Sequence, residues 1–231
     1  MVLAAGLGLR MRPLTEHTPK PLIPVAGRCM LDRVFAHLDA VGVPSRVVNA
    51  HWLAPRLHAH LAGRPGVALS DEAELLETGG GVARALPLLG AAPFYVCNAD
   101  VLWTDGAAGP ALARLAAAWD DAAMDALLLL VARERAFGYD GPGDFLRGDD
   151  GRLARRAADI TAPFVFTGVQ ILHPRLFADA PSGAFSLNLL YDRAQRAGRL
   201  YGLVHDGGWY HIGTPAALAA AEARLAAAGD P

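Results

Sequence analysis

Two glycines and a cation follow the first apolar residues of the chain. Gly6 and Gly8 are separated by one residue, and Arg10 comes shortly after them. Glycines allow a sharp turn that brings backbone N–H groups close to an anion, and a guanidinium beside them would add positive charge. The spacing indicates a phosphate-binding loop, but a Gly-x-Gly pair by itself is also typical of a tight structural turn.

The loop completes neither of the two common nucleotide-binding motifs. A dinucleotide fingerprint would need a third glycine where the chain has Met11, and a P-loop would need Gly-Lys-Ser/Thr. An acidic ribose contact about 20 residues beyond the loop, in a βαβ unit, is also missing. A nicotinamide-dependent dehydrogenase is therefore disfavoured.

Lys20 is the single lysine among 21 basic residues. All the others are arginines, in a chain rich in alanine, so the composition favours arginine where a basic residue is needed. A compact ammonium and a planar guanidinium are not interchangeable where one point charge must reach a phosphate in a tight space. Lys20 is therefore a candidate phosphate contact, unless it is a lysine retained by chance on a loop.

Two further segments lie where α/β proteins bind ligands. Asp100 follows the apolar run 94–97, a predicted buried strand, and ligands bind at the carboxyl ends of strands in open α/β sheets. Residues 77–81 precede a predicted helix, so their amides are expected at the positive end of its dipole. Each segment also has a structural interpretation, because a strand-end Asp often forms a turn and a glycine run is typical of a flexible helix start.

Short apolar runs alternate with segments of helical period along the whole chain. This pattern predicts an α/β fold with a doubly wound, mostly parallel sheet, and 231 residues without a repeat or a linker fit a single domain. The predicted strands cover 2–4, 46–49, 67–69, 94–97, 126–131, 164–172 and 200–204, and the predicted helices cover 31–41, 54–61, 82–89, 110–119, 187–197 and 215–228.

Composition excludes several classes of protein. A formal net charge of −2 with scattered arginines provides no basic footprint for nucleic acid. Two cysteines, Cys29 and Cys97, cannot form a disulfide framework, which favours a reducing compartment. Apolar runs are far shorter than the ~20 residues of a membrane helix. We expect a cytoplasmic protein that binds neither nucleic acid nor membrane, and the sequence leaves its oligomeric state open.

The glycine loop belongs to a longer string, Gly-x-Gly-x-Arg-Met-x-Pro-Leu-Thr over residues 6–15, followed by Pro-Lys-Pro-Leu over 19–22. This string resembles the signature of the sugar-1-phosphate nucleotidyltransferases, or NDP-sugar pyrophosphorylases. The resemblance implies a Rossmann-like fold and a reaction in which a nucleoside triphosphate and a sugar 1-phosphate give an NDP-sugar and pyrophosphate. It also implies a nucleotide-binding half over residues 1–132 and a sugar-phosphate-binding half over 133–231.

The same resemblance assigns roles to residues of the first half. Arg10, Lys20 and Asp100 are expected to be catalytic, because in the family the two cations contact the phosphates and the Asp binds a divalent metal, here Mg²⁺ or Mn²⁺. Nucleotide contacts are expected from the loop, from the 77–81 segment and from one strand end: Leu3, Ala4, Ala5, Gly6, Gly8, Thr78, Gly79, Gly80 and Asn98.

Contacts to the sugar phosphate and to a second metal position follow from the resemblance as well. The residues expected at the sugar phosphate are Asn49, Glu77, Asp144, Thr167 and Gly168. Relatives have Trp-x-Asp-x-Gly-Thr at the second metal position, whereas this chain has His211 in place of the Asp. Imidazole suits Mn²⁺ better than Mg²⁺, so His211 either ligates the metal or packs beside the site, and the choice of metal is open.

The Glu-Thr-Gly-Gly-Gly string at 77–81 resembles a segment of one subset of the family, the uridylyltransferases of N-acetylmuramic acid α-1-phosphate. This likeness favours UTP and N-acetylmuramic acid 1-phosphate as substrates, in peptidoglycan recycling. Guanylyl transfer to mannose 1-phosphate is the alternative within the family. A nucleotide- or sugar-binding module that has lost catalysis is the alternative of another class, motivated by His211.

Overall fold

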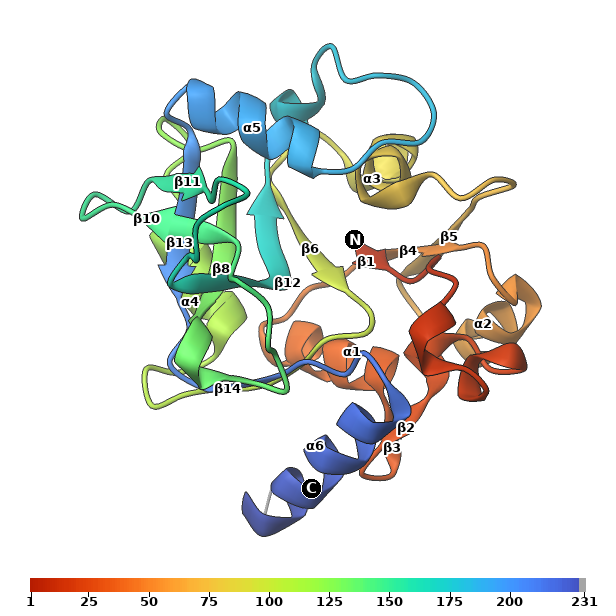
Figure 1. The fold of residues 1–231 in the computed structure, drawn as a ribbon. Coiled ribbons are helices and arrows are strands. Elements are labelled where there is room, and N and C mark those ends of the chain that lie inside the picture. The colour runs from red at the N-terminus through yellow and green to blue at the C-terminus, as the bar shows by residue number, and fades with distance from the viewer. Residues whose placement is uncertain (229–231) are drawn as a thin grey trace.

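A computed structural model describes residues 1–228, and these residues form a central nine-stranded sheet (Figure 1). The order along the sheet is β11-β10-β12-β6-β1-β4-β5, and β8 pairs with both β12 and β13. The strands are β1 (Val2–Leu3), β4 (Arg46–Ala50), β5 (Val67–Asp71), β6 (Phe94–Asn98), β8 (Ala126–Ala132), β10 (Phe145–Arg147), β11 (Leu153–Arg155), β12 (Phe164–Leu172) and β13 (Leu200–Val204).

Strand direction follows the doubly wound pattern in the first half of the chain. β6, β1, β4 and β5 are parallel neighbours, and β8 and β13 are parallel to each other. β12 runs antiparallel between β6 and β8, so it joins strands from distant parts of the chain in one sheet. The prediction of an α/β fold with a mostly parallel sheet is confirmed.

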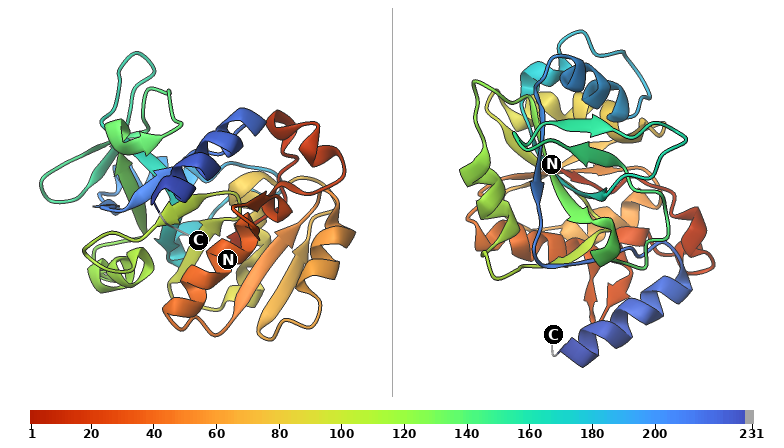
Figure 2. Two further views of the ribbon diagram at one scale, coloured as in Figure 1. Left: turned by 90° about the horizontal axis from the view of Figure 1, so that it is seen from below. Right: turned by 60° about the vertical axis from the view of Figure 1, so that its left-hand side comes forward.

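Helices cover both faces of this sheet (Figures 1 and 2). α3 and α5 pack on the face to which Val47 and Val96 point, and α1, α2 and α4 pack on the face to which Val48 and Cys97 point. Because both faces are buried, a central strand such as β8 is a continuous apolar run. The helices are α1 (Met30–Ala40), α2 (Ala54–Leu61), α3 (Glu77–Leu89), α4 (Ala111–Ala118), α5 (Asn188–Arg196) and α6 (Pro215–Ala228).

Two small sheets lie beside the large one and connect it to α6. Leu225 of α6 is buried with Met11 and Ile212 in a separate apolar cluster, and Glu222 Oε1 accepts a hydrogen bond from the Ala26 N–H. α6 therefore packs against residues that flank the glycine loop. The strands of the small sheets are β2 (Pro24–Val25), β3 (Arg28–Cys29), β7 (Leu102–Thr104), β9 (Ala136–Phe137) and β14 (Gly208–Tyr210).

Most predicted elements agree with the structure to within a few residues, and one boundary was wrong. The helices at 54–61 and 215–228 and the strands at 164–172 and 200–204 have the predicted bounds. Residues 77–81, however, do not precede a helix, because α3 begins at Glu77 and includes all three glycines. Glycine disfavours helix formation by about 1 kcal/mol relative to alanine, so tertiary packing must stabilise this helical start.

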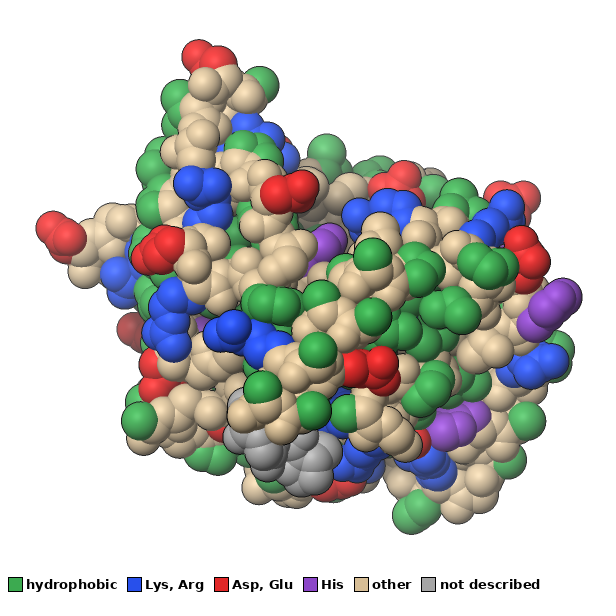
Figure 3. All heavy atoms as spheres, turned by 60° about the horizontal axis from the view of Figure 1, so that its bottom comes forward, with side chains coloured by type: hydrophobic (Ala, Val, Ile, Leu, Met, Phe, Trp, Pro, Cys, Tyr) green, Lys and Arg blue, Asp and Glu red, His purple; other side chains and the backbone are tan. Residues whose placement is uncertain are grey.

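No helix over residues 1–228 combines the length and apolarity that crossing a membrane would require. On the face shown in Figure 3, acidic and basic side chains are interspersed with uncharged ones, as expected from the small net charge.

Candidate active site

The glycine loop leaves β1 and folds back through two short 3-10 turns, Leu9–Met11 and Leu14–Glu16. Gly8 has φ of 62°, in the left-handed region that glycine adopts without strain, and a Cβ there would lie 2.8 Å from Thr15 Cγ2. The Thr15 hydroxyl donates to Gly8 O over 2.8 Å, and Trp52 Nε1 donates to Thr15 O over 3.0 Å. These bonds hold the loop in one shape.

A cavity of about 630 Å³ lies over the loop, at the carboxyl ends of β1, β4 and β6. This is the edge at which open α/β sheets bind ligands. Predicted residues that line it are Leu3, Ala4, Ala5, Gly6, Gly8, Arg10, Lys20, Asn49, Glu77, Thr78, Asn98 and Asp100. It is also lined by residues that we did not predict, namely Leu9, Met11, Pro21, Leu75, Ser186 and Gly213.

Lys20 and Asp100 form an ion pair on the wall of this cavity. Lys20 Nζ lies 2.6 Å from Asp100 Oδ2, and the Lys20 side chain is 12% exposed against 39% for Asp100. Within residues 1–228, Asp100 Oδ1 accepts no hydrogen bond. The compact ammonium therefore sits in a narrow place with one protein acceptor, and the carboxylate keeps an unused oxygen.

Arg10 lines the same cavity and is exposed. Over the part of the chain that the structure describes, its guanidinium makes no hydrogen bond and no ion pair. A planar guanidinium without a protein acceptor can bind phosphate oxygens in a bidentate manner.

His211 does not line the cavity, although Gly213 does. Its ring centroid lies 5.9 Å from that of Tyr139 and 6.0 Å from that of Trp209. The imidazole, directly after β14, therefore packs beside two aromatic rings.

The surroundings of His211 favour its neutral form. Burial lowers the pKa of His211 below its ordinary value, and the positive charges of Arg10 and Lys20 add to this effect, whereas nearby carboxylates oppose it. A neutral imidazole offers a nitrogen lone pair that can ligate a metal. The aromatic packing and this lone pair leave both roles of His211 open.

Asn49 connects the glycine loop to a residue that we did not predict. Asn49 Oδ1 accepts from the Ala4 N–H over 2.7 Å, and its Nδ2 donates to Glu72 Oε1 over 2.6 Å. Glu72 Oε2 accepts from the Leu76 N–H over 3.0 Å, and Glu72 is only 4% exposed. One buried carboxylate thus holds both the loop and the start of α3, with Asn49 as the bridge. Its position directly after β5 is the signal that could have identified it.

The glycines of α3 lie behind the cavity rather than on it. The N–H groups of Gly79 and Gly80 donate to Phe185 O over 2.8 and 3.1 Å, and a Cβ on Gly79 would lie 2.3 Å from the Phe185 ring. Their amides are therefore occupied by the protein. Glu77 and Thr78, the two residues directly before Gly79, do line the cavity, and the Thr78 hydroxyl accepts from the Leu187 N–H.

Three residues predicted at the sugar phosphate do not line the cavity. Asp144 Oδ2 accepts from the Phe166 N–H over 2.8 Å, and burial raises the pKa of Asp144. Thr167 is fully buried and donates its hydroxyl to Leu129 O over 2.8 Å. Gly168 has φ of 85° where the register of β12 shifts, and a Cβ there would lie 2.9 Å from Asn98 Nδ2. Asp144 and Thr167 therefore bind backbone groups of β12 and β8, and Gly168 lies against Asn98.

Comparison with known proteins identifies relatives over nearly the whole chain. Residues 1–227 match the family described as MobA-like NTP transferase domain. The chain is 44% identical to N-acetylmuramate alpha-1-phosphate uridylyltransferase from Caulobacter vibrioides, covering 99% of this chain and 97% of that protein. It is 36% identical to the protein of the same name from Neisseria meningitidis serogroup B, covering 96% of each.

Solved structures with the same fold include a putative glucose-1-phosphate thymidylyltransferase from Bacillus anthracis. The TM-score is 0.79 at 16% identity, and the match covers 96% of this chain and 93% of the other. At this identity the likeness shows the fold alone.

Proposed function

The chain belongs to the family of MobA-like NTP transferase domains, and we propose that it transfers a uridylyl group from UTP to N-acetylmuramic acid α-1-phosphate, releasing pyrophosphate. The observation that carries this proposal is that the glycine loop, Arg10, Lys20 and Asp100 line one cavity. Identity to two uridylyltransferases over nearly the full length favours this substrate pair over GTP with mannose 1-phosphate.

The acceptor supplies its own nucleophile. A sugar 1-phosphate is largely dianionic at pH 7, because its second pKa is about 6, so no protein base is needed. One of its oxygens attacks the α-phosphorus of UTP, the bond from that phosphorus to the bridging oxygen of the β-phosphate breaks, and pyrophosphate leaves with the electron pair. The protein must align two anions and offset the charge that develops on the leaving group.

The residues of the cavity suit these tasks. The N–H groups of the glycine loop and the guanidinium of Arg10, which has no acceptor among residues 1–228, are expected to hold the triphosphate. Lys20, which has Asp100 as its protein partner, is expected to exchange this carboxylate for a phosphate oxygen as UTP enters. Thr78 and Asn98 are expected to contact the nucleoside, and Asn49 and Glu77, which line the same cavity, are expected at the sugar phosphate.

Asp100 fits a divalent metal, because Mg²⁺ and Mn²⁺ prefer oxygen ligands and Asp100 Oδ1 is unused on the cavity wall. A bound metal would neutralise charge on the phosphates during the transfer. Because only one of the two expected metal positions, Asp100, is a carboxylate, we expect weak metal affinity before the nucleotide is present, and His211 is the candidate second ligand.

The substrate assignment is tested by measuring pyrophosphate release from UTP, GTP, CTP and dTTP, each with N-acetylmuramic acid, N-acetylglucosamine and mannose 1-phosphates. We expect the highest kcat/KM for UTP with N-acetylmuramic acid 1-phosphate. A higher value for GTP with mannose 1-phosphate would replace this assignment. Calorimetric UTP binding without pyrophosphate release from any pair would support the non-catalytic module instead.

The role of His211 is tested by His211→Asp, which restores the carboxylate that relatives have. If His211 ligates the metal, the ratio of activities with Mn²⁺ and Mg²⁺ should fall in this variant, because the softer nitrogen ligand is replaced by oxygen. An unchanged ratio would assign His211 to packing against Tyr139 and Trp209.

These substrates place the reaction in peptidoglycan recycling, which we propose as its setting. The two cysteines are free thiols, as expected for a protein of the cytoplasm.

A further inference from the structure

Three side chains with metal-ligand chemistry meet between α1 and α2, away from the cavity. Cys29 ends β3, Asp32 lies in the first turn of α1, and His60 lies near the end of α2. One ligand atom from each lies within 4.8 Å of the other two. None of the three lines the cavity of the candidate active site.

The spacing of these atoms resembles that of a tetrahedral zinc site. Cys29 Sγ lies 3.7 Å from His60 Nε2, which lies 3.0 Å from Asp32 Oδ1. With ligand distances of about 2.3 Å for sulfur and about 2.0 Å for nitrogen and oxygen, tetrahedral geometry separates two ligands by roughly 3.3–3.6 Å. Small side-chain movements would therefore suffice to place an ion among the three.

The hydrogen-bonding needs of the His60 ring nitrogen are incompletely met within this cluster. His60 Nε2 also lies 3.0 Å from Arg64 Nη2, a donor, while Asp32 Oδ1 is an acceptor. One ring nitrogen can either donate or accept a hydrogen bond. A protonated Nε2 would face the Arg64 N–H, donor against donor, and an unprotonated Nε2 would face Asp32 Oδ1, acceptor against acceptor. A cation would satisfy the nitrogen, the carboxylate and the sulfur at once.

The obstacle to a cation is Arg64, and Arg64 can move. Its Nη1 lies 2.7 Å from Asp32 Oδ1, so it occupies the positive side of the cluster. The Arg64 side chain is 34% exposed, and its guanidinium lies 5.5 Å from the centre of the Phe35 ring. It can therefore withdraw toward solvent and the ring without leaving a buried charge unpaired.

We propose that Cys29, Asp32 and His60 form a second, structural metal site for a thiophilic divalent cation, with Zn²⁺ as the best fit and water as the fourth ligand. A thiolate and an imidazole select zinc, whereas the oxygen ligand at the candidate active site suits Mg²⁺ or Mn²⁺. On binding, the Cys29 thiol releases its proton to solvent. The ion ties β3 and the start of α1 to α2, and so stabilises the segment that follows Lys20.

Zinc binding is measured on untagged protein that has been freed of metal by a chelator, in excess Mg²⁺. We expect one equivalent of Zn²⁺ to bind and to raise the melting temperature. Co²⁺ should produce the near-ultraviolet band of thiolate-to-cobalt charge transfer, which a site without sulfur cannot produce.

Matched variants identify the ligands. Cys29→Ser and His60→Gln should each weaken Zn²⁺ binding by more than about 100-fold, whereas Cys97→Ser, at the other thiol, should leave it unchanged. Arg64→Ala should tighten binding, because a competing cation is removed. Absence of the charge-transfer band, or zinc affinity that survives both Cys29→Ser and His60→Gln, would overturn the site.

Discussion

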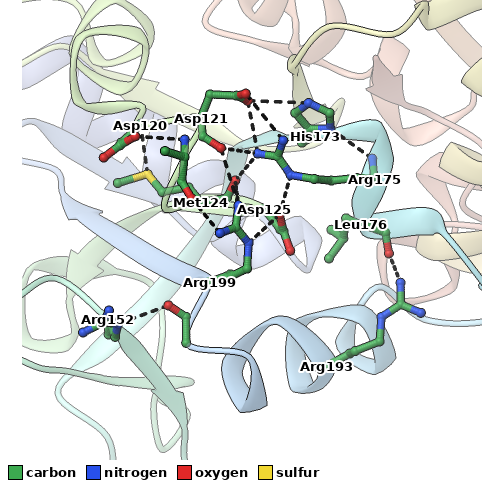
Figure 4. A network of polar contacts seen from close by, with 12 residues as sticks. Asp120, Asp121, Met124, Asp125, Arg152, His173, Arg175, Leu176, Arg193 and Arg199 are labelled. Atoms are coloured by element: carbon green, nitrogen blue, oxygen red, sulfur yellow. Dashed lines mark hydrogen bonds and ion pairs between the residues drawn. The ribbon is translucent and has the colours of Figure 1, made fainter.

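Charged side chains at the two ends of β6 and β8 are used in opposite ways. At the amino ends, Asp125 Oδ1 accepts from Arg175 Nε over 2.6 Å and from Arg199 Nε over 2.9 Å (Figure 4). Both guanidiniums also donate to the carbonyl oxygens of Asp121 and Met124. Protein acceptors thus occupy these two arginines on several sides.

At the carboxyl ends, the charges are incompletely paired. Lys20 has one carboxylate partner, and Arg10 has no acceptor within residues 1–228. The two ends carry similar charges and differ in how many protein acceptors surround the cations, so the number of acceptors distinguishes a structural cluster from a binding site. Where the acceptors are complete the cluster holds the fold, and where they are incomplete a ligand can provide them.

The largest expected effect is that of Lys20→Ala on catalysis. Removing one preorganised cation from the leaving group should lower kcat/KM by roughly 10²–10³-fold, measured by pyrophosphate release. Lys20→Arg should restore only part of the rate, because a guanidinium does not fit the place of a compact ammonium. Turnover close to that of the unaltered protein in Lys20→Ala would remove Lys20 from the mechanism.

Asp125→Ala should show the reverse pattern. Asp125 is 16% exposed, and its loss leaves two guanidiniums without their shared acceptor. We expect the free energy of unfolding to fall by roughly 1–3 kcal/mol, measured by chemical denaturation, while kcat/KM of the folded protein stays nearly the same. A large loss of kcat/KM at unchanged stability would contradict the structural role of the charged cluster at the amino ends of β6 and β8.

Glu72→Gln should lower both kcat/KM and the free energy of unfolding, because the buried Glu72 holds the glycine loop through Asn49. The amide replaces one acceptor by a donor, so one hydrogen bond, to Asn49 or to the Leu76 N–H, is lost. We expect kcat/KM to fall by about tenfold, with a higher KM for UTP, since the net loss of such a bond is about 1 kcal/mol or more. Glu74→Gln, at an exposed position two residues away, is the matched control, and an equal effect of both variants would exclude the positioning role.

The smallest expected effect concerns His205, a buried residue that directly follows β13. Its Nε2 lies 3.0 Å from Thr104 O, and its Nδ1 is buried without a partner within residues 1–228. Burial lowers the pKa of His205 below the unfolded value of about 6.5. The unfolded chain therefore binds more protons as the pH falls through about 6.5, and the folded state loses stability there.

Denaturation at pH 7.5 and pH 5.5 measures this dependence. His205→Gln should reduce the loss of stability on acidification, and His17→Gln, at an exposed position, should not. Burial also lowers the pKa of His37, so part of the dependence should remain in His205→Gln. A dependence identical to that of the unaltered protein would exclude His205 as a contributor.

The sequence predicts the features that depend on residues close together along the chain. The glycine loop, Asp100 after its strand and the alternation of strands and helices each depend on neighbours within a few residues. The pairing of Lys20 with Asp100 and the role of Glu72 depend on contacts between distant segments, which spacing does not show.

Hidden tertiary contacts also explain the predictions that differ from the structure. The sequence predicts that the 77–81 segment precedes a helix, because spacing does not show the Phe185 carbonyl, more than a hundred residues away, that accepts from the N–H groups of Gly79 and Gly80. Asp144, Thr167 and Gly168 are expected at the sugar phosphate from the family resemblance, and in the structure they contact residues of the protein outside the cavity lining. Their roles toward the sugar phosphate stay predictions.

The close packing of α3 has a consequence for how this protein can change in evolution. A Cβ on Gly79 would lie 2.3 Å from the Phe185 ring, one on Gly80 would lie 2.3 Å from Gly183 O, and one on Gly81 would lie 2.8 Å from Glu72 Oε1. Substitutions at these glycines are therefore excluded by neighbours within the protein, whatever nucleotide it binds. In a library of variants, intolerance at these positions would measure a steric constraint, whereas Glu77, Thr78 and Ser186, which line the cavity, are positions where substitutions could change substrate preference.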